Sequence, residues 1–229
     1  MEYLHNGFTL ELCDGGFPLS TDSVALAGFV KLPKSACVLD LGAGCGTLGL
    51  LLCASDPGCS VTGIELSEDA HNAALKNAER NGISHRLTSI CGDIRSIPEF
   101  LAPGSFHTCV SNPPYFTGGP VSADNGQARH THQCTSEDLF RSAGWALKWG
   151  GDFYIVHKPE SLGELCGRAA KYQLQPKELT LVRHDITKPV SLILLKFRNG
   201  AKPGLMWKEL LLHTPTGEPT EQYRAIYHL

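Results

Sequence analysis

The run Ser111-Asn112-Pro113-Pro114-Tyr115 could hold a planar group that carries an NH2. The apolar residues 106–110 before it predict a strand, which would place the run at that strand's C-terminal end. Two consecutive prolines fix φ and remove two backbone donors, so they favour a stiff, extended turn. Such a turn leaves the Asn112 amide and the Pro113 carbonyl free to face a ligand, with the Tyr115 ring beside them. Taken alone, the run is more often an ordinary X-Pro-Pro loop.

Three other predicted strands end in residues that suit a nucleotide-like ligand. The buried-type strand 37–41 leads into Gly42-Ala43-Gly44-Cys45-Gly46 and a helical segment, the strand 60–64 ends in Glu65, and the strand 87–91 leads into Gly92-Asp93-Ile94. Strand, glycine turn and helix in this order are typical of the nucleotide-binding start of a doubly wound sheet, whose ligands bind at the carboxyl edge. Each acid alone could be a helix N-cap. Together with Asn112 they favour one ligand site.

The glycine spacing argues against a dinucleotide. The loop is G-x-G-x-G after Asp40, whereas a dinucleotide fingerprint is G-x-G-x-x-G. A carboxylate at Asp40 suits the cationic amino acid end of a ligand better than a pyrophosphate. Glu65 is placed to accept both hydroxyls of an adenosine ribose. Asp93 could accept from an adenine amino group while Ile94 packs against the ring.

The composition favours a soluble globular domain. The chain has 229 residues, of which 42% are hydrophobic and 19% charged, and it has no apolar run of membrane-spanning length. The N-terminal residues lack the pattern of a signal peptide, so we expect a cytoplasmic protein. Nine cysteines contain no C-x-x-C pair, and His130 and His132 have no acid or Cys at ligand spacing. These patterns favour reduced, mostly buried thiols and no metal.

The charge is unevenly distributed along the chain. Residues 1–167 carry 10 Lys and Arg against 18 Asp and Glu, a net charge of −8, and residues 168–208 carry 9 against 2, a net charge of +7. A basic segment on an acidic body is either a footprint for a polyanion or a solvated basic surface. Charge alone does not decide between them.

With these residues in place, the chain resembles the class I S-adenosylmethionine (SAM)-dependent methyltransferases. The Asn-Pro-Pro-Tyr form is shared by enzymes that methylate N6 of adenine in DNA or RNA and by glutamine N5-methyltransferases. Flanking motifs resemble the tRNA1(Val) adenine-37 N6-methyltransferase-like family in its Gram-positive form. They are Gly16-Phe17-Pro18-Leu19-Ser20-Thr21-Asp22, Ala128-Arg129-His130, Val156-His157-Lys158-Pro159-Glu160, Gln175-Pro176-Lys177 and Thr220-Glu221. Thr131 and Ser161 depart from that family, where Glu and Arg are common.

The resemblance implies an α/β, Rossmann-like fold. Its seven-stranded, mostly parallel sheet would have one antiparallel strand and helices on both faces. Residues 1–34 would form an N-terminal hairpin and helix that cap the cofactor site, residues 35–200 the methyltransferase domain, and residues 201–229 a C-terminal strand and tail on the same domain. A monomer or a weak homodimer is expected.

The resemblance also implies the site residues. The catalytic run would be Asn112, Pro113, Pro114 and Tyr115, with Tyr115 stacked on a flipped base. SAM would be bound by Phe17, Thr21, Asp40, Gly42, Gly44, Gly46, Glu65, Leu66, Asp93, Ile94 and Asn112. The substrate, an adenine of RNA and most specifically of a tRNA anticodon loop, would contact Arg129, Lys158 and Lys177.

Four other functions compete with this interpretation. A glutamine N5-methyltransferase of proteins uses the same Asn-Pro-Pro-Tyr turn but usually carries a larger N-terminal helical domain, whereas about 35 residues precede the first strand of this sheet. Another adenine or guanine amino group, in rRNA or DNA, is a second alternative. A non-enzymatic RNA-binding protein would not need the intact Asn112, Pro113 and Tyr115. A nicotinamide dehydrogenase would need the G-x-G-x-x-G spacing.

Overall fold

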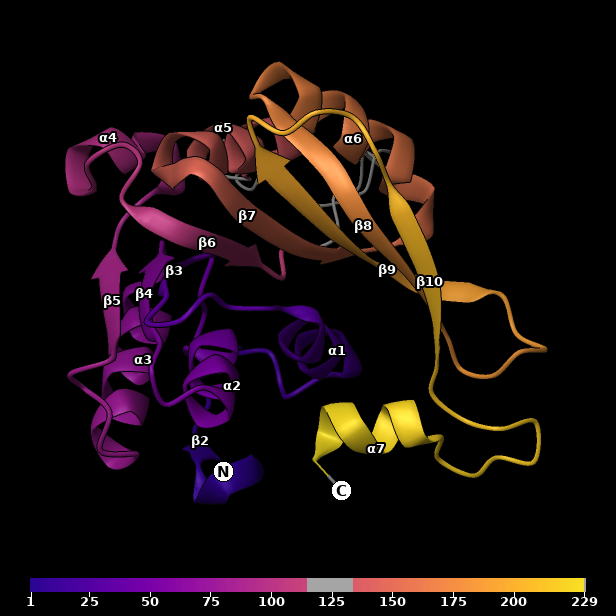
Figure 1. The fold of residues 1–229 in the computed structure, drawn as a ribbon. Coiled ribbons are helices and arrows are strands. Elements are labelled where there is room, and N and C mark those ends of the chain that lie inside the picture. Colours follow the sequence, from indigo (N-terminus) through magenta and orange to yellow (C-terminus); the bar gives the residue numbers. More distant parts are fainter. Residues whose placement is uncertain (115–133, 229) are drawn as a thin grey trace, which may run out of the picture.

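An eight-stranded, mostly parallel sheet forms the centre of the computed structural model, which describes residues 1–114 and 134–228 (Figure 1). The strand order is β10-β8-β9-β7-β6-β3-β4-β5. In it β9 runs antiparallel to both of its neighbours, and the other neighbouring strands pair in parallel. The strands are β3 (Cys37–Leu41), β4 (Ser60–Glu65), β5 (Leu87–Cys91), β6 (Phe106–Ser111), β7 (Leu147–His157), β8 (Leu174–Arg183), β9 (Val190–Asn199) and β10 (Met206–Leu211).

Helices cover both faces of this sheet (Figure 1). One face carries α1 (Thr21–Phe29), α2 (Thr47–Ser55), α3 (Glu68–Arg80) and α7 (Glu221–Tyr227), and the other carries α4 (Ile97–Phe100), α5 (Ser136–Ala146) and α6 (Leu162–Lys171). Successive strand residues point to opposite faces, so Val38 joins the first core and Leu39 the second. The short elements are β1 (Glu2–Tyr3), η1 (His5–Gly7), β2 (Thr9–Leu10), η2 (Ile94–Ser96) and η3 (Pro159–Ser161).

The predicted Rossmann-like architecture is confirmed, with one strand more than the seven expected. The additional strand is β10, which pairs in parallel with the edge of β8 from Met206↔Glu178 to Leu211↔Arg183. The expected antiparallel strand is β9, which forms a hairpin with β8. The sheet can accept β10 because an edge strand offers a row of unpaired backbone donors and acceptors.

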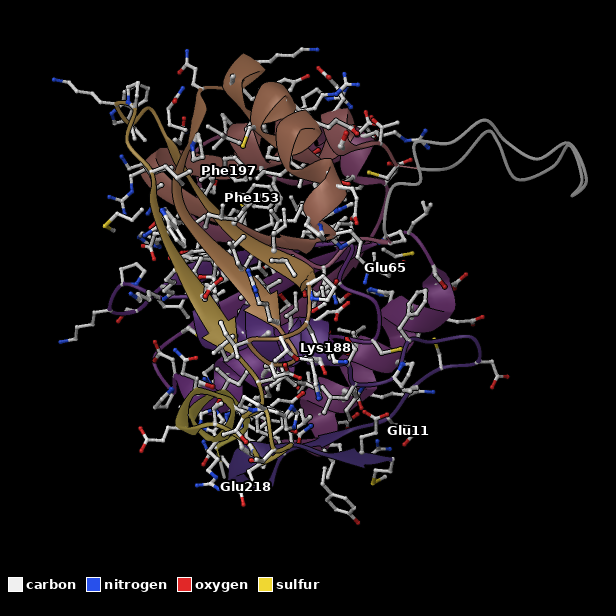
Figure 2. All side chains as sticks on the ribbon, turned by 90° about the vertical axis from the view of Figure 1, so that its right-hand side faces the viewer. Glu11, Glu65, Phe153, Lys188, Phe197 and Glu218 are labelled. Carbon is white, nitrogen blue, oxygen red and sulfur yellow. The ribbon has the colours of Figure 1, made fainter. Side chains whose placement is uncertain are left out.

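Aromatic packing fixes the core beneath α5. The Phe140 ring stands edge-on to both Phe153 and Phe197, with centroid separations of 5.5 and 5.2 Å. All three side chains are fully buried, and Figure 2 shows Phe153 and Phe197 together within the sheet. Pairs of this geometry stabilise a core by about 0.5–1.5 kcal/mol beyond their buried area. The packing holds α5 against β7 and β9.

Both chain ends are attached to the helices of the first face. The Asn77 side chain of α3 accepts from the Glu11 backbone N–H and donates to the Glu11 carbonyl, at 2.9 and 2.8 Å. At the other end, the Tyr227 hydroxyl of α7 donates to Thr21 Oγ1 at 3.2 Å. Gly28 of α1 lets the two helices approach closely, because a Cβ there would lie 2.8 Å from Ile226. Among residues 1–114 and 134–228, no helix has the length and hydrophobicity needed to span a bilayer.

Candidate active site

Four strand ends come together at the carboxyl edge, a name used here for the C-terminal ends of β3, β4, β5 and β6. The register places them side by side, because Asp40 pairs with Gly63 and Val110 while Glu65 pairs with Cys91. The edge therefore collects Asp40 with its glycine loop, Glu65, Asp93 and Asn112, as the sequence predicts.

The glycine loop between β3 and α2 is held against β4 and leaves open space beside it. The Gly42 and Ala43 N–H groups both donate to the Ile64 carbonyl, at 3.0 and 3.1 Å. Gly42 and Gly44 have φ values of +77° and +55°, a region that L side chains rarely adopt, and a Cβ at either would meet no atom within 4 Å. Gly46 caps α2 with φ +84°. A ligand can thus approach the backbone of this loop closely.

Glu65 ties the glycine loop to the start of α3. One carboxylate oxygen accepts from the Gly44 N–H and the other from the Ser67 N–H, each at 2.8 Å. Figure 2 labels Glu65 at this part of the molecule. Leu66, next in the chain, is 55% exposed. Glu65 therefore has a structural role at the loop besides the ribose binding that the sequence predicts.

Asp40 is a buried acid with an incomplete set of partners. Its side chain is 1% exposed, and Oδ1 has no hydrogen-bond partner among the described residues. Burial, and secondly the charge of Glu65, raise the pKa of Asp40 to about 8. A buried polar atom without a partner is costly, and such atoms are concentrated at ligand sites. A donor from a cationic ligand would complete this group.

Asp93 is more engaged than the sequence indicates. Oδ1 accepts from the Arg95 backbone N–H at 2.8 Å, and Oδ2 accepts from the Arg95 guanidinium at 2.6 and 2.8 Å. The neighbouring Ile94 is buried in the core beneath α5. Because a carboxylate oxygen can accept more than one hydrogen bond, contact with an adenine amino group stays a prediction.

The Asn112 amide is oriented by a serine that the sequence interpretation missed. Asn112 Nδ2 donates to Ser23 Oγ of α1 at 3.0 Å, and Ser23 is buried. Ser23 Oγ in turn lies 3.4 Å from Ser20 Oγ, the N-cap of α1. If the Ser23 hydroxyl donates to Ser20, its lone pair faces the NH2 of Asn112. This arrangement leaves Asn112 Oδ1 without a partner among the described residues and available to a substrate.

The rest of the turn is partly described. Ser111 Oγ donates to the Leu41 carbonyl at 2.7 Å, which fixes the end of β6 to the end of β3. Pro113 is buried and Pro114 is exposed. Tyr115 lies outside the described residues, as do Arg129 and the departure at Thr131.

Four remaining predicted contacts lie at different places. Phe17 is 81% exposed in the segment before α1, and Thr21 opens α1. Lys158 is exposed just after β7. Lys177 lies in β8, and its Nζ donates to the Lys202 carbonyl at 3.2 Å. The register sets Lys177 apart from the carboxyl edge, three strands from β6 and level with its middle.

No three or more His, Cys, Asp or Glu side chains within residues 1–114 and 134–228 are grouped so as to hold a metal ion. His130 and His132 lie outside these residues. Glu65 and Asp93 accept hydrogen bonds from backbone N–H groups, and Asp93 also from the Arg95 side chain.

The parallel sheet and its carboxyl edge define a SAM-dependent methyltransferase. Comparison of the chain with known protein families, sequences and structures agrees with this class. Residues 21–164, more than half of the chain, match the family described as methyltransferase small domain, so the chain belongs to that family. Two relatives bear the name tRNA1(Val) (adenine(37)-N6)-methyltransferase. One from Photobacterium profundum is 32% identical over 96% of this chain and 95% of its own length. One from Bacteroides fragilis is 31% identical over 75% and 71%.

Solved structures share the fold. A "predicted O-methyltransferase" from Agrobacterium tumefaciens has a TM-score of 0.77 and 21% identity, covering 91% of this chain and 96% of its own. Geranyl diphosphate C-methyltransferase from Streptomyces coelicolor, in complex with S-adenosyl-L-homocysteine, has a TM-score of 0.59 and 13% identity, covering 77% and 78%. At these identities the likeness concerns the fold alone.

The carboxyl edge fits SAM on three observations. Asp40 offers a buried carboxylate oxygen to which no described residue donates, which suits a cationic ligand. The open space beside Gly42 and Gly44 lets the cofactor reach the loop backbone. Glu65 adds carboxylate oxygens next to that space. When bound, SAM supplies an electrophilic methyl group.

The raised pKa of Asp40 predicts a pH-dependent stability in the SAM-free protein. The folded pKa of about 8 lies above the ordinary value of 3.8, so Asp40 contributes stability below about pH 4 that is lost as the pH rises towards 8. One pKa unit corresponds to about 1.4 kcal/mol, so the contribution should fall by a few kcal/mol from pH 5 to pH 7. Denaturant unfolding at several pH values measures it.

The matched variant for this measurement is Asp40→Asn. The variant keeps the other titrating groups, such as His157, whose pKa is lowered mainly by burial. The difference in unfolding free energy between the two proteins therefore reports the titration of Asp40 alone. A difference in unfolding free energy that stays constant from pH 5 to pH 8 would contradict the raised pKa.

Proposed function

We propose that this protein transfers the methyl group of SAM to N6 of an adenine in RNA, and specifically to an adenine in a tRNA anticodon loop. The proposal is carried by the Asn112-Pro113-Pro114 turn, which lies at the carboxyl edge with its amide fixed by Ser23. The relatives named tRNA1(Val) (adenine(37)-N6)-methyltransferase support the choice of substrate.

In this proposal the turn activates the adenine amino group, which is a poor nucleophile. The lone pair of an adenine amino group is delocalised into the ring. Asn112 Oδ1 and the Pro113 carbonyl would accept from its two N–H bonds, which favours a localised lone pair directed at the methyl group. Fixing the reacting atoms in line supplies the larger share of the acceleration. Tyr115 would stack on the flipped base.

The cofactor would be held by the residues predicted from the sequence. Asp40 and the glycines at 42, 44 and 46 would bind its methionine end, with Phe17 and Thr21 closing over it. Glu65 and Leu66 would contact the ribose, and Asp93 and Ile94 the adenine. Arg129, Lys158 and Lys177 would contact RNA.

The basic segment presents less free charge than its composition implies. Five of its nine Lys and Arg residues form ion pairs with acids, namely Arg168, Lys171, Arg183, Lys196 and Arg198. Among the described residues no ion pair involves Lys177, Lys188, Lys202 or Lys208. The charge of this segment that is not already paired with an acid therefore comes from these four lysines.

Finer features belong to the same proposal. They are the Gram-positive form of the family (the relatives reported above are from Gram-negative bacteria), a cytoplasmic location, a monomer or weak homodimer, and the division into residues 1–34, 35–200 and 201–229. Methylation of glutamine N5 in a protein, or of an amino group in rRNA or DNA, uses the same turn and is the alternative to be tested.

The deciding experiment is methylation of total tRNA, rRNA, DNA and protein by the pure enzyme with labelled SAM. Nucleoside mass spectrometry of the labelled tRNA should find N6-methyladenosine. Label that appears only in protein would replace this proposal by the glutamine reaction.

The contact between Asn112 and Ser23 leads to a separate prediction. Ser23→Ala should lower kcat about tenfold, because the loss of one hydrogen bond of about 1.4 kcal/mol lets the amide turn its NH2 towards the substrate. The dissociation constant of SAM should not change. Single-turnover rates and calorimetric titration measure the two quantities.

Ser20→Ala is the matched control for Ser23→Ala. It removes the N-cap of α1, a loss of about 1 kcal/mol in stability, and the weak 3.4 Å contact with Ser23 Oγ, while Ser23 Oγ itself, the acceptor of the Asn112 amide, stays in place. Equal losses of kcat in the two variants would mean that α1 stability, rather than the amide orientation, explains the effect.

A further inference from the structure

We propose that an aromatic groove along α5 binds a stretch of the RNA that lies away from the target adenine. The groove has a volume of about 440 Å³, and the lining residues that matter here are Arg95, Arg141, Trp145, Trp149, Lys171 and Tyr172. The inference rests on the proposed RNA substrate and adds a second contact surface for it.

The aromatic residues of the groove are exposed yet held in place. Trp149 is 74% exposed and Trp145 38%. The Trp145 Nε1–H donates to the Leu101 carbonyl at 3.2 Å. The Trp149 ring lies on the backbone at Gly200, where an added Cβ would collide with it. Exposed tryptophans fixed in this way are unusual on a surface without a partner, and flat rings are platforms on which bases stack.

The charged side chains of the groove are all cationic. Of the described residues that line it, none is acidic and three are cations. Ion pairs with acids outside the lining orient them: Arg95 with Asp93 at 2.6 Å, Arg141 with Asp138 at 2.8 Å and Lys171 with Glu137 at 3.0 Å. Each guanidinium has five N–H donors, so the ion pair leaves donors for a phosphate.

The groove runs from the carboxyl end of β5 towards the opposite edge of the sheet. Arg95 follows Asp93 by two residues and is bonded to it, so one end of the groove touches the predicted adenine side of the SAM site. From there the groove follows α5 past Arg141 and Trp145 to Trp149 at the start of β7. Because Leu147 pairs with Phe106 at the start of β6, Trp149 lies at the edge of the sheet opposite to Asn112, so the groove would contact RNA at a distance from the target adenine.

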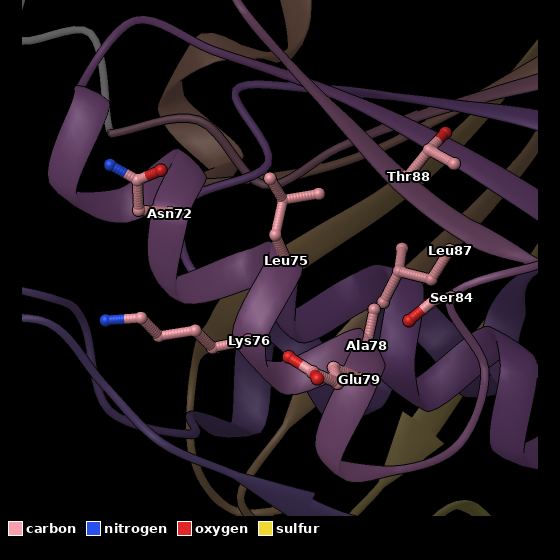
Figure 3. Close-up of a pocket in the computed structure, with 8 residues that line it drawn as sticks. All are labelled: Asn72, Leu75, Lys76, Ala78, Glu79, Ser84, Leu87 and Thr88. Atoms are coloured by element: carbon pink, nitrogen blue, oxygen red, sulfur yellow. The ribbon is translucent and has the colours of Figure 1, made fainter.

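A second cavity provides the contrast. It has a volume of about 500 Å³, lies between α3 and β5, and is lined by residues that include Leu75, Lys76 and Glu79 (Figure 3). The part of the chain that the structure describes contributes no aromatic side chain to it, and one cation there is matched by one acid. Size alone therefore does not identify an RNA surface, whereas exposed aromatic rings beside cations are typical of one.

The test measures RNA binding separately from methyl transfer. Full-length protein with S-adenosyl-L-homocysteine would be titrated with unmodified tRNA, and then assayed for kcat and KM with SAM. Trp149→Ala combined with Arg141→Ala should raise the Kd and KM for tRNA about tenfold to a hundredfold, since the stacking surface and a phosphate contact are lost. The Kd of SAM and kcat should stay within about twofold. Trp149→Phe, which keeps a ring, should recover most of the affinity.

Leu75→Ala with Lys76→Ala, in the second cavity, is the matched control and should bind tRNA like the wild type. If the wild type methylates tRNA but the groove variant binds tRNA as tightly as the wild type does, the groove is not an RNA surface. The proposed function would then stand. A wild type that neither binds nor methylates RNA would overturn both. Sedimentation showing a wild-type dimer that the groove substitutions dissociate would assign the surface to a second copy instead.

Discussion

Asn112→Ala should lower kcat for methyl transfer about a hundredfold to a thousandfold. The substitution removes the Oδ1 acceptor for the substrate amine, and removing one preorganised polar contact of this kind typically has an effect of about this size. It also leaves the Ser23 hydroxyl without the amide that it orients. The Kd of SAM should change by less than about threefold, because Asp40 and Glu65 stay in place. Single-turnover assays with labelled SAM measure the rate, and calorimetry measures the affinity.

Asn112→Asp separates the acceptor from the amide. It keeps an oxygen for the substrate amine but has no NH2 to donate to Ser23, so we expect a smaller loss than with alanine. An alanine variant with more than a tenth of the wild-type kcat would show that the turn is not the catalytic element. Loss of SAM affinity in parallel with kcat would show that Asn112 acts mainly on the cofactor.

The architecture follows from short-range patterns for most of its length. The buried-type strand 37–41 and its glycine turn are specified by the local sequence, which is why the carboxyl edge is predictable from the sequence. The eighth strand could not be predicted as part of the sheet. Met206, Trp207 and Lys208 are exposed and lack a strand-like apolar pattern, so β10 depends on the free edge of β8, which exists only in the folded protein.

The site was predictable in its residue types and not in their partners. Asp40, Glu65 and Asp93 stand directly at strand ends, so topology alone places them. Ser23 lies 89 residues from Asn112, and the packing of α1 rather than any local pattern brings them together. The sequence likewise does not reveal which charged side chains are paired. Composition counts Lys196 as a free cation, whereas in the fold it forms an ion pair with Asp152 at 3.2 Å.

Glu65→Gln should raise the Kd of SAM about a hundredfold. The carboxylate accepts from Gly44 and Ser67, and an amide would turn an NH2 towards one of these N–H groups. Leaving a donor unsatisfied and losing a charged acceptor costs about 1–3 kcal/mol each, enough for that change.

Calorimetric titration with SAM measures this effect, and Glu68→Gln, an exposed acid in the first turn of α3, is the matched control. A Kd of Glu65→Gln within threefold of the wild type would contradict the role of Glu65. The same variant tests the electrostatics of the edge, because the Glu65 charge is the second cause of the raised pKa of Asp40. Removal of the Glu65 charge should lower the pKa of Asp40, so the loss of stability with rising pH should end at a lower pH. The loss should not disappear, because burial is the larger cause of the raised pKa and remains.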